Sequence, residues 1–226
     1  MNLQEPFVAT QPLARRTLVG GLATLGVAAL VRPAVAALPQ DVQFKVFREG
    51  SEIGTHRVGF RPTPAGFDVD VSIQLEVKIA FITVFRYGQT ARDQWQDGNL
   101  VAAEYQTDDD GKRSTVRVRR DGSRLRVEGT AGSFQAPLGT MTDLSFWNLG
   151  IMQAPQLVDS QTGQLGTIKT DGRGADRLVI GGREVQADRY TVSGSQDRAG
   201  KIWYVQRQWV KASFVTRGQA LEYVLA

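Results

Sequence analysis

The stretch from residue 67 to residue 81 reads FDVDVSIQLEVKIAF, and its pattern decides the fold class. Every odd position is apolar, and every even position from Asp68 to Lys78 is polar. Successive side chains of a β-strand point to opposite faces, so this alternation predicts a strand with one dry and one wet face. Such strands are typical of an antiparallel sheet that buries one side against a core.

The alternation fails at Ile79, because residues 79–85 are apolar or weakly polar on both parities. A single strand from Phe67 to Tyr87 would be about 70 Å long at roughly 3.3 Å per residue, far beyond a usual strand. We therefore expect the chain to bend or turn near Ala80, for example through a β-bulge that coils the sheet.

The remainder of the chain is predicted to be strand after strand, with no long 3.6-residue periodicity after residue 37. Asp-Gly and Gly-Gly pairs at 97–98, 110–111, 121–122 and 181–182 predict tight hairpin turns. The predicted fold class is all-β: a single curved antiparallel sheet, either a half-barrel or an open barrel. We expect one short helix or loop near 142–153, with Thr142 or Asp143 capping its start.

Residues 1–36 are predicted to be a cleavable signal peptide of the twin-arginine type. Arg15-Arg16 stand before an uncharged run from Thr17 to Val31, and Ala34-Val35-Ala36 forms a small-x-small cleavage site. Several glycines make the run only moderately apolar, which favours the twin-arginine route over the general secretory one.

A membrane anchor is the competing interpretation of the same run. An anchor needs about 20 apolar residues, and Arg32 with Pro33 ends this run earlier. We therefore expect residues 37–226 to form a single β-rich domain that works in the periplasm, with no transmembrane segment after cleavage.

The composition argues against several classes of function. The chain has one histidine and no cysteine, which disfavours a transition-metal site, a disulfide framework and a serine triad. Loss of residues 1–36, with their three arginines and one glutamate, lowers the formal net charge from +4 to +2, too little for a nucleic-acid partner. We predict a non-enzymatic protein without cofactor or metal, and a hydrogen-bonded strand position for His56.

Four arginines share the wet face of a predicted hairpin. They are Arg117, Arg119, Arg124 and Arg126. A two-residue turn at Asp121-Gly122 would set them opposite each other as Arg119–Arg124 and Arg117–Arg126, which costs very roughly 0.2–1 kcal/mol per pair. One hypothesis is an anion-binding site for a lipid headgroup, a sugar acid or phosphate. The alternative is a screened, solvated arginine ladder.

Large apolar side chains near the bend and in the 142–153 segment exceed what one alternating face needs. The candidates for ligand contact are Ile79, Phe81, Phe85, Phe146 and Trp147. A curved sheet with a loop across its mouth is a common way to form a lipid-sized pocket. Plain core packing at the bend is the alternative interpretation.

Short strand-and-turn motifs are spread over nearly the whole chain after residue 37. They read FKVFREGSEIG at 44–54, VKI at 77–79, VFRY at 84–87, WQDGNL at 95–100, SFWN at 145–148, WY at 203–204 and WV at 209–210. Together they resemble a family of exported proteobacterial proteins catalogued as a domain of unknown function. The resemblance implies a curved antiparallel sheet similar to the half-barrels of LolA/LolB-like lipoprotein carriers, and it implies no catalytic residues.

These observations lead to three hypotheses for the function. The first is a periplasmic binding or carrier protein for an apolar or amphiphilic, lipid-like ligand. The second is an envelope structural or interaction module, without a small-molecule ligand, whose arginine face docks an envelope protein. The third is a carboxylate-dependent hydrolase of envelope glycans.

Overall fold

The computed structural model describes residues 38–195, 199–216 and 218–226, and the predicted signal peptide of residues 1–36 lies outside them. The described chain forms a 15-stranded sheet and two short 3₁₀ helices. The strands are β1 Val42–Arg48, β2 Ser51–Thr63, β3 Gly66–Ile79, β4 Ile82–Gln96, β5 Asn99–Asp109, β6 Lys112–Asp121, β7 Arg124–Gly129, β8 Gly132–Pro137, β9 Met141–Thr142, β10 Gln156–Val158, β11 Leu165–Ile180, β12 Arg183–Gly194, β13 Ala199–Val205, β14 Gln208–Thr216 and β15 Gln219–Leu225. The helices are η1 Ser145–Trp147 and η2 Leu149–Gln153.

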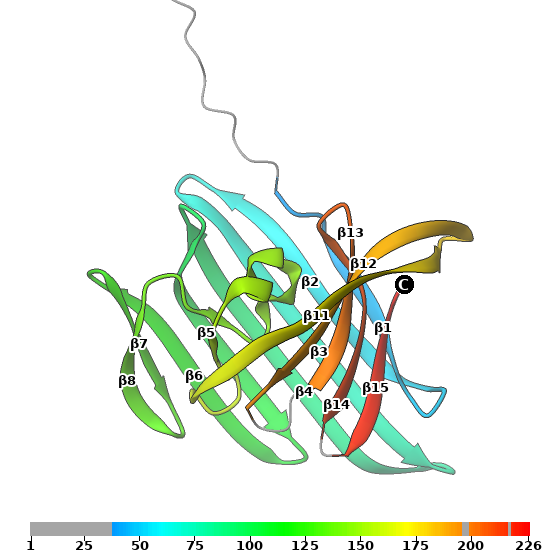
Figure 1. The fold of residues 1–226 in the computed structure, drawn as a ribbon. Helices are drawn as coiled ribbons and strands as arrows, with labels where there is room; N and C mark the ends of the chain where they lie inside the picture. The colour runs from blue at the N-terminus through cyan, green and yellow to red at the C-terminus, as the bar shows by residue number, and fades with distance from the viewer. Residues whose placement is uncertain (1–37, 196–198, 217) are drawn as a thin grey trace, which may run out of the picture. The chain divides into compact units, whose positions relative to one another are not determined.

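The two halves of the sheet meet where the first strand pairs with the last. The order is β8-β7-β6-β5-β4-β3-β2-β1-β15-β14-β13-β12-β11-β10-β9, and Phe44 of β1 lies opposite Leu225 of β15. All pairs are antiparallel except β9 with β10. Because β8 and β9 are the two edges, the sheet is open, and Figure 1 shows it curving from one edge towards the other. The predicted all-β class with one open curved sheet is confirmed.

The break in alternation at residue 79 is a hairpin turn. Strand β3 ends at Ile79 and β4 begins at Ile82, with Ala80 between them at a φ of 52°. The prediction of a turn near Ala80 is confirmed, and a β-bulge is not what reverses the chain there. The ladder does shift its register near the turn, between Val77 and Lys78.

Three of the four predicted glycine turns lie where the sequence places them, at 97–98, 110–111 and 181–182. The fourth is displaced by one residue. Strand β6 ends at Asp121 and β7 begins at Arg124, so the turn residues are Gly122 and Ser123. The predicted arginine pairing is therefore wrong, because a one-residue displacement of the turn shifts every cross-strand partner by two residues.

The segment at 142–153 contains two 3₁₀ turns instead of one helix. Asn148 caps η2 by accepting a hydrogen bond from the Gly150 N–H at 2.9 Å, whereas η1 has no side-chain cap. The predicted cap at Thr142 or Asp143 is wrong, since η1 starts after Leu144 without a side-chain cap. The Asp143 carboxylate instead accepts a hydrogen bond from the Ser160 N–H at 2.9 Å. Its role is to tie the segment to the loop after β10.

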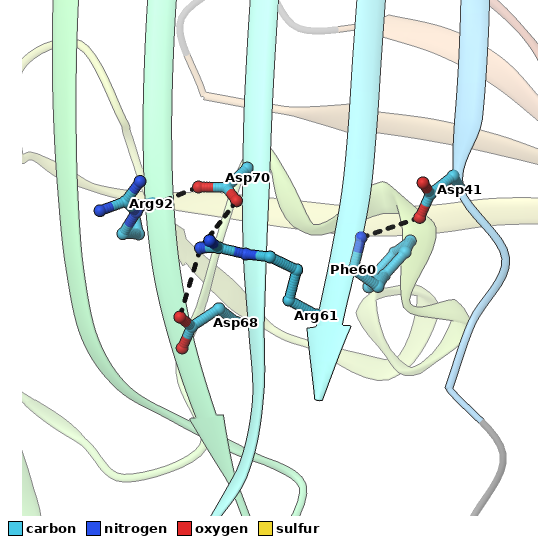
Figure 2. A network of polar contacts seen from close by, with 6 residues as sticks. All are labelled: Asp41, Phe60, Arg61, Asp68, Asp70 and Arg92. Atoms are coloured by element: carbon cyan, nitrogen blue, oxygen red, sulfur yellow. Dashed lines mark hydrogen bonds and ion pairs between the residues drawn. The ribbon is translucent and has the colours of Figure 1, made fainter. Parts of the chain in front are cut away.

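The wet face of β3 is a row of ion pairs on the outside of the sheet, as the alternation predicts. Arg61 of β2 lies between Asp68 and Asp70 at 3.4 and 2.9 Å, and Arg92 of β4 contacts Asp70 at 3.1 Å. Figure 2 shows this chain of charges crossing the three strands. The odd positions of β3 point the other way, and its central valines and Ile73 belong to the core.

Candidate functional site

A cavity of about 1420 Å³ lies on the inner face, between the β1–β4 part of the sheet and the part formed by β11, β12, β14 and β15. Its apolar lining comes from both halves of the chain and includes Leu75, Phe85, Phe146, Trp209, Phe214 and Leu221. Pockets for small ligands usually measure roughly 300–1,000 Å³ and are mostly apolar, with a few polar groups. This cavity is larger, and it has the same character.

One row of residues crosses the sheet at the level of the cavity. The strand pairings place them side by side in the order Phe44, His56, Ile73, Gln89 and Thr107, from β1 to β5. His56, Gln89 and Thr107 are polar although they lie on the inner face, where apolar side chains would need no hydrogen-bond partners. His56, Ile73 and Gln89 line the cavity.

Gln89 is fully engaged in hydrogen bonds. Its side-chain nitrogen donates to Thr107 Oγ1 at 3.0 Å and to Ser160 Oγ at 2.9 Å, and its oxygen accepts from the Tyr87 hydroxyl at 3.0 Å. Buried amides are stable when their donors and acceptors are satisfied. Gln89 therefore ties the sheet to the loop at residue 160 and fixes one wall of the cavity.

His56 differs from Gln89 in this respect. The side chain is only 4% exposed, and within the described residues neither ring nitrogen has a hydrogen-bond partner. Its place on a strand agrees with the sequence analysis, but the expected hydrogen bond is not formed. Burial lowers the pKa of the imidazole to about 3, so the ring is neutral at physiological pH.

Four aromatic rings pack together on the inner face at the end away from the β3–β4 hairpin. Trp147 of η1 packs edge-on against Phe60, Phe67 and Trp95, with centroid distances of 5.1, 5.8 and 5.0 Å. Figure 1 shows the 3₁₀ segment that carries Trp147 lying over the sheet. Trp147 thus packs the segment onto the sheet.

Asp93 of β4 is a fully buried carboxyl near this aromatic cluster. Within the described residues neither carboxyl oxygen has a hydrogen bond of good geometry, because the nearby Tyr105 hydroxyl donates to Thr142 Oγ1 at 3.2 Å. Tyr105 and Trp95 still lie close enough to offset part of the rise in the pKa of Asp93. Burial raises the pKa of Asp93 to about 7, with Asp143 adding a smaller contribution of the same sign. The carboxyl is therefore mainly neutral below pH 7.

The β3–β4 hairpin carries apolar side chains into solvent at the open end of the cavity. Phe81 is 99% exposed, Ile79 68% and Ile82 70%. Just below this tip the Glu76 carboxylate accepts a hydrogen bond from the Thr83 hydroxyl at 2.6 Å, and it also pairs with two basic side chains. Polar contacts therefore stabilise the base of the hairpin, and the apolar side chains at its tip are exposed to solvent.

The five apolar candidates from the sequence occupy three different places. Ile79, Phe85 and Phe146 line the cavity. Phe81 projects from the hairpin tip, and Trp147 belongs to the aromatic cluster. Sequence reasoning missed His56, Gln89 and the C-terminal aromatic residues of the lining, such as Trp209. The alternation along each strand could have shown that these side chains point inwards. It could not have shown which strands face each other across the cavity.

The four candidate arginines lie on the outer face, on strands β6 and β7, whose inward side chains such as Val118 and Val127 are buried. Arg117 has Glu104 on one side, at 3.4 Å, and Glu128 opposite it on the other. Arg126 pairs with Glu128 at 2.6 Å.

The remaining two arginines have different surroundings. Arg124 donates to the Gln135 carbonyl at 3.2 Å, and Arg119 lies directly opposite Arg126. One like-charge pair therefore persists on this face, where two were predicted. Carboxylates lie beside the arginines, which reduces the positive charge that an anion would meet.

The described residues offer no cluster for a metal ion and no membrane-spanning helix. Among them, no three histidine, cysteine, aspartate or glutamate side chains gather in a way that could hold a metal ion. The same residues contain no helix with the length and apolar character needed to cross a membrane.

Comparisons with known proteins connect the chain to a family and to one solved fold. Residues 44–226 match the model of a family described as "Domain of unknown function (DUF6134)". No curated protein matches the chain. A crystal structure of a "Beta-barrel-like Protein of Domain of Unknown Function DUF1849 from Brucella abortus" is similar, with a TM-score of 0.56 and 10% identity. The match covers 85% of this chain and 98% of that one, and at this identity it shows the fold alone.

Proposed function

The chain belongs to the DUF6134 family of domains of unknown function, and we propose that it is a non-enzymatic binding or carrier protein for an apolar or amphiphilic, lipid-like ligand. The cavity of about 1420 Å³ on the inner face carries this proposal. A sheet that only needed a core would fill this space with side chains, because protein interiors are close-packed.

The shape of the lining supports a long ligand with one polar end. Apolar side chains from β3, β4 and β14 run from the inner face to the open end, and polar groups such as His56 and Gln89 lie in the row across the sheet. The exposed apolar tip of the β3–β4 hairpin continues the lining outwards through Ile79 and Val84. An acyl chain entering at this end would meet the apolar side chains of Ile79, Val84 and Phe85 before it reaches the row across the sheet.

The proposal places the protein in the periplasm, where residues 1–36 would direct it before their removal. This location follows from Arg15-Arg16 and the cleavage motif Ala34-Val35-Ala36. Sequencing the N-terminus of protein recovered from the periplasm tests it, and a start near Ala37 is expected.

Native mass spectrometry of the purified protein tests the ligand. A co-purified amphiphile is expected, released on denaturation and identified by extraction. Val215→Trp enlarges a half-exposed side chain of the lining and should lower the bound fraction. Val179→Trp is the matched control, since Val179 is exposed outside the lining and its replacement should leave the bound fraction unchanged.

Protein that is ligand-free when isolated, and that binds no added amphiphile, would contradict the proposal. The interaction-module hypothesis would then be the better one.

A further inference from the structure

We propose that His56 anchors the polar head of the ligand, and that this head is an uncharged group which both donates and accepts hydrogen bonds, such as a hydroxyl or an amide. The inference rests on the proposed function, because it names the ligand class for the same cavity. It goes further by assigning the residue that recognises the head and the charge that the head carries.

The position of His56 gives the first argument. It lies in the middle of β2, between Phe44 and Ile73 in the row across the sheet, and its side chain lines the cavity. Its ring packs against Trp209 and Tyr223 from the C-terminal half, with centroid distances of 5.4 and 5.7 Å. Aromatic rings from both halves thus hold the imidazole in one orientation at the bottom of the apolar lining.

The unpaired ring nitrogens give the second argument. Both Nδ1 and Nε2 are buried without a partner among the described residues. A buried polar group without a hydrogen bond is destabilising, and native proteins keep few of them. Gln89 lies two strands away in the same row, and its side-chain amide makes hydrogen bonds through both its nitrogen and its oxygen. The fold can therefore supply hydrogen-bond partners to a buried polar side chain in this row. A ligand group is the partner that we infer for His56, since none of the described residues supplies one.

The charges around the cavity define that partner. The neutral imidazole has one donor and one acceptor, which complements a group that has both. The charged residues of the lining are mostly acidic: Glu49, Glu52, Glu76, Asp143 and Asp159, against Arg48 and Lys78. Two of these carboxylates are ion-paired, Glu52 with Lys45 and Glu76 with Lys78 and Arg86, so the lining offers no surplus of positive charge to an anion. A carboxylate or phosphate head would lose its hydration beside a neutral ring without gaining a cation there.

Arg48 marks where an anionic head would bind instead. It lies at the end of β1, four residues from Phe44, which corresponds to about 13 Å along the strand. An anion held there would leave His56 beside the acyl chain. The two arrangements therefore make opposite predictions for variants at position 48 and position 56.

Calorimetric titration with two probes of equal chain length separates these arrangements. The probes are monolauroylglycerol, which has a neutral head with hydroxyls, and laurate, which is anionic. Loss of one hydrogen bond should weaken monolauroylglycerol binding to His56→Leu by roughly 5- to 20-fold, while His56→Gln, which keeps a donor and an acceptor, should lose less. Arg57→Gln is the matched control, because Arg57 follows His56 on β2 but is exposed and outside the cavity lining, and it should leave monolauroylglycerol binding unchanged. Arg48→Gln should weaken laurate binding only if the anionic arrangement holds.

Nitrogen-15 NMR of the wild-type imidazole gives a readout that does not depend on how well the variants fold. His56 is the only histidine in the chain, so protein prepared without a histidine tag shows a single imidazole. Monolauroylglycerol should shift both ring nitrogens, as hydrogen-bond formation does, and dodecane should not shift them in this way.

The binding measurements distinguish the inference about His56 from the anionic arrangement and from a failure of the proposed function. The inference is overturned if both probes bind and neither responds to His56→Leu, as would happen if ordered water satisfied the ring. It is also overturned if laurate binds more tightly than monolauroylglycerol and depends on Arg48. If neither probe nor dodecane binds, the proposed function itself fails, and the inference fails with it.

Discussion

His56 and Asp93 lie on the same inner face of the sheet, both buried, and burial shifts their pKa values in opposite directions. Asp93 is four positions after Gln89 on β4, and Gln89 lies in the row of His56, so the two groups lie at different levels of the sheet. The pKa of His56 falls to about 3 and that of Asp93 rises to about 7. Both side chains are therefore held in their neutral forms in weakly acidic solution.

Asp93→Asn tests the carboxyl. Because its pKa rises from an ordinary 3.8 to about 7, Asp93 contributes stability that is complete below pH 3.8 and is lost as the pH rises through 7. The loss amounts to about 4 kcal/mol, since one pKa unit corresponds to about 1.4 kcal/mol. Urea unfolding at several pH values should show wild type losing stability relative to Asp93→Asn between pH 4 and 8. A constant difference between the two proteins would contradict the buried carboxyl.

His56→Leu tests the imidazole, whose effect on stability changes with pH in the opposite direction to that of Asp93. The pKa of His56 falls from 6.5 to about 3, so its contribution is complete above pH 6.5 and is lost as the pH falls towards 3. The variant should therefore gain stability relative to wild type as the solution is acidified, by up to about 5 kcal/mol. In wild type the two effects oppose each other between pH 4 and 6.5. Asp93→Asn alone should consequently be more sensitive to acid than wild type.

Phe81→Ser tests the role of the hairpin tip. The side chain is 99% exposed, so its loss should change the free energy of unfolding by less than about 0.5 kcal/mol. If the ligand enters past this tip, transfer of a fluorescent fatty amphiphile from vesicles to the protein should slow down while the equilibrium affinity stays the same. Val179→Ser, another exposed apolar position, is the control. Unchanged transfer rates would place the entry elsewhere.

Arg119→Glu tests the arginine face. Arg119 lies opposite Arg126 and next to Ala102, so a glutamate there would replace a like-charge pair with an opposite-charge pair. We expect stabilisation by about 0.2–1 kcal/mol, reduced at high salt. Arg117→Gln should instead destabilise slightly, because it breaks the contact with Glu104. Thermal unfolding at low and high salt measures both. Destabilisation by Arg119→Glu would show that the cross-strand pair is not repulsive.

Trp147→Ala tests the aromatic cluster. The indole is buried against Phe60, Phe67 and Trp95, so its removal should cost about 3–5 kcal/mol and loosen the 3₁₀ segment. Urea unfolding measures the loss. Amphiphile binding by the fraction that remains folded should persist, because Trp147 packs at the closed end. Loss of binding in a fully folded variant would instead make Trp147 part of the ligand site.

The strands of the N-terminal half could be read from local pattern, because alternation and turn dipeptides act over a few residues. Residues 67–81 predicted both the strand and the turn at Ala80. The Asp97-Gly98 and Asp110-Gly111 pairs marked turns correctly. The arginine hairpin shows the limit of this reasoning: at Asp121-Gly122-Ser123 two adjacent dipeptides could form the turn, and a displacement of one residue changed the partner of every arginine.

Only some residues of the candidate site could be predicted from the sequence, because the others lie far apart along the chain. Ile79, Phe85 and Phe146 line the cavity, and they could be identified because their segments contain more apolar residues than one buried face of a strand requires. His56 and Trp209 were not identified as partners in a site, because more than 150 residues separate them. Nothing in either local segment indicates that the other packs against it.

The amino-acid sequence by itself determined which residues form strands, which parity of each strand points inwards and where most of the turns lie. These properties follow from side-chain alternation and backbone preferences over a few neighbouring residues. The tertiary structure alone decided that β1 pairs with β15, that the open sheet keeps a cavity and that His56 finds no hydrogen-bond partner among the described residues around it. Those features depend on contacts between distant segments, and such contacts exist only once the curvature of the whole sheet brings its two halves together.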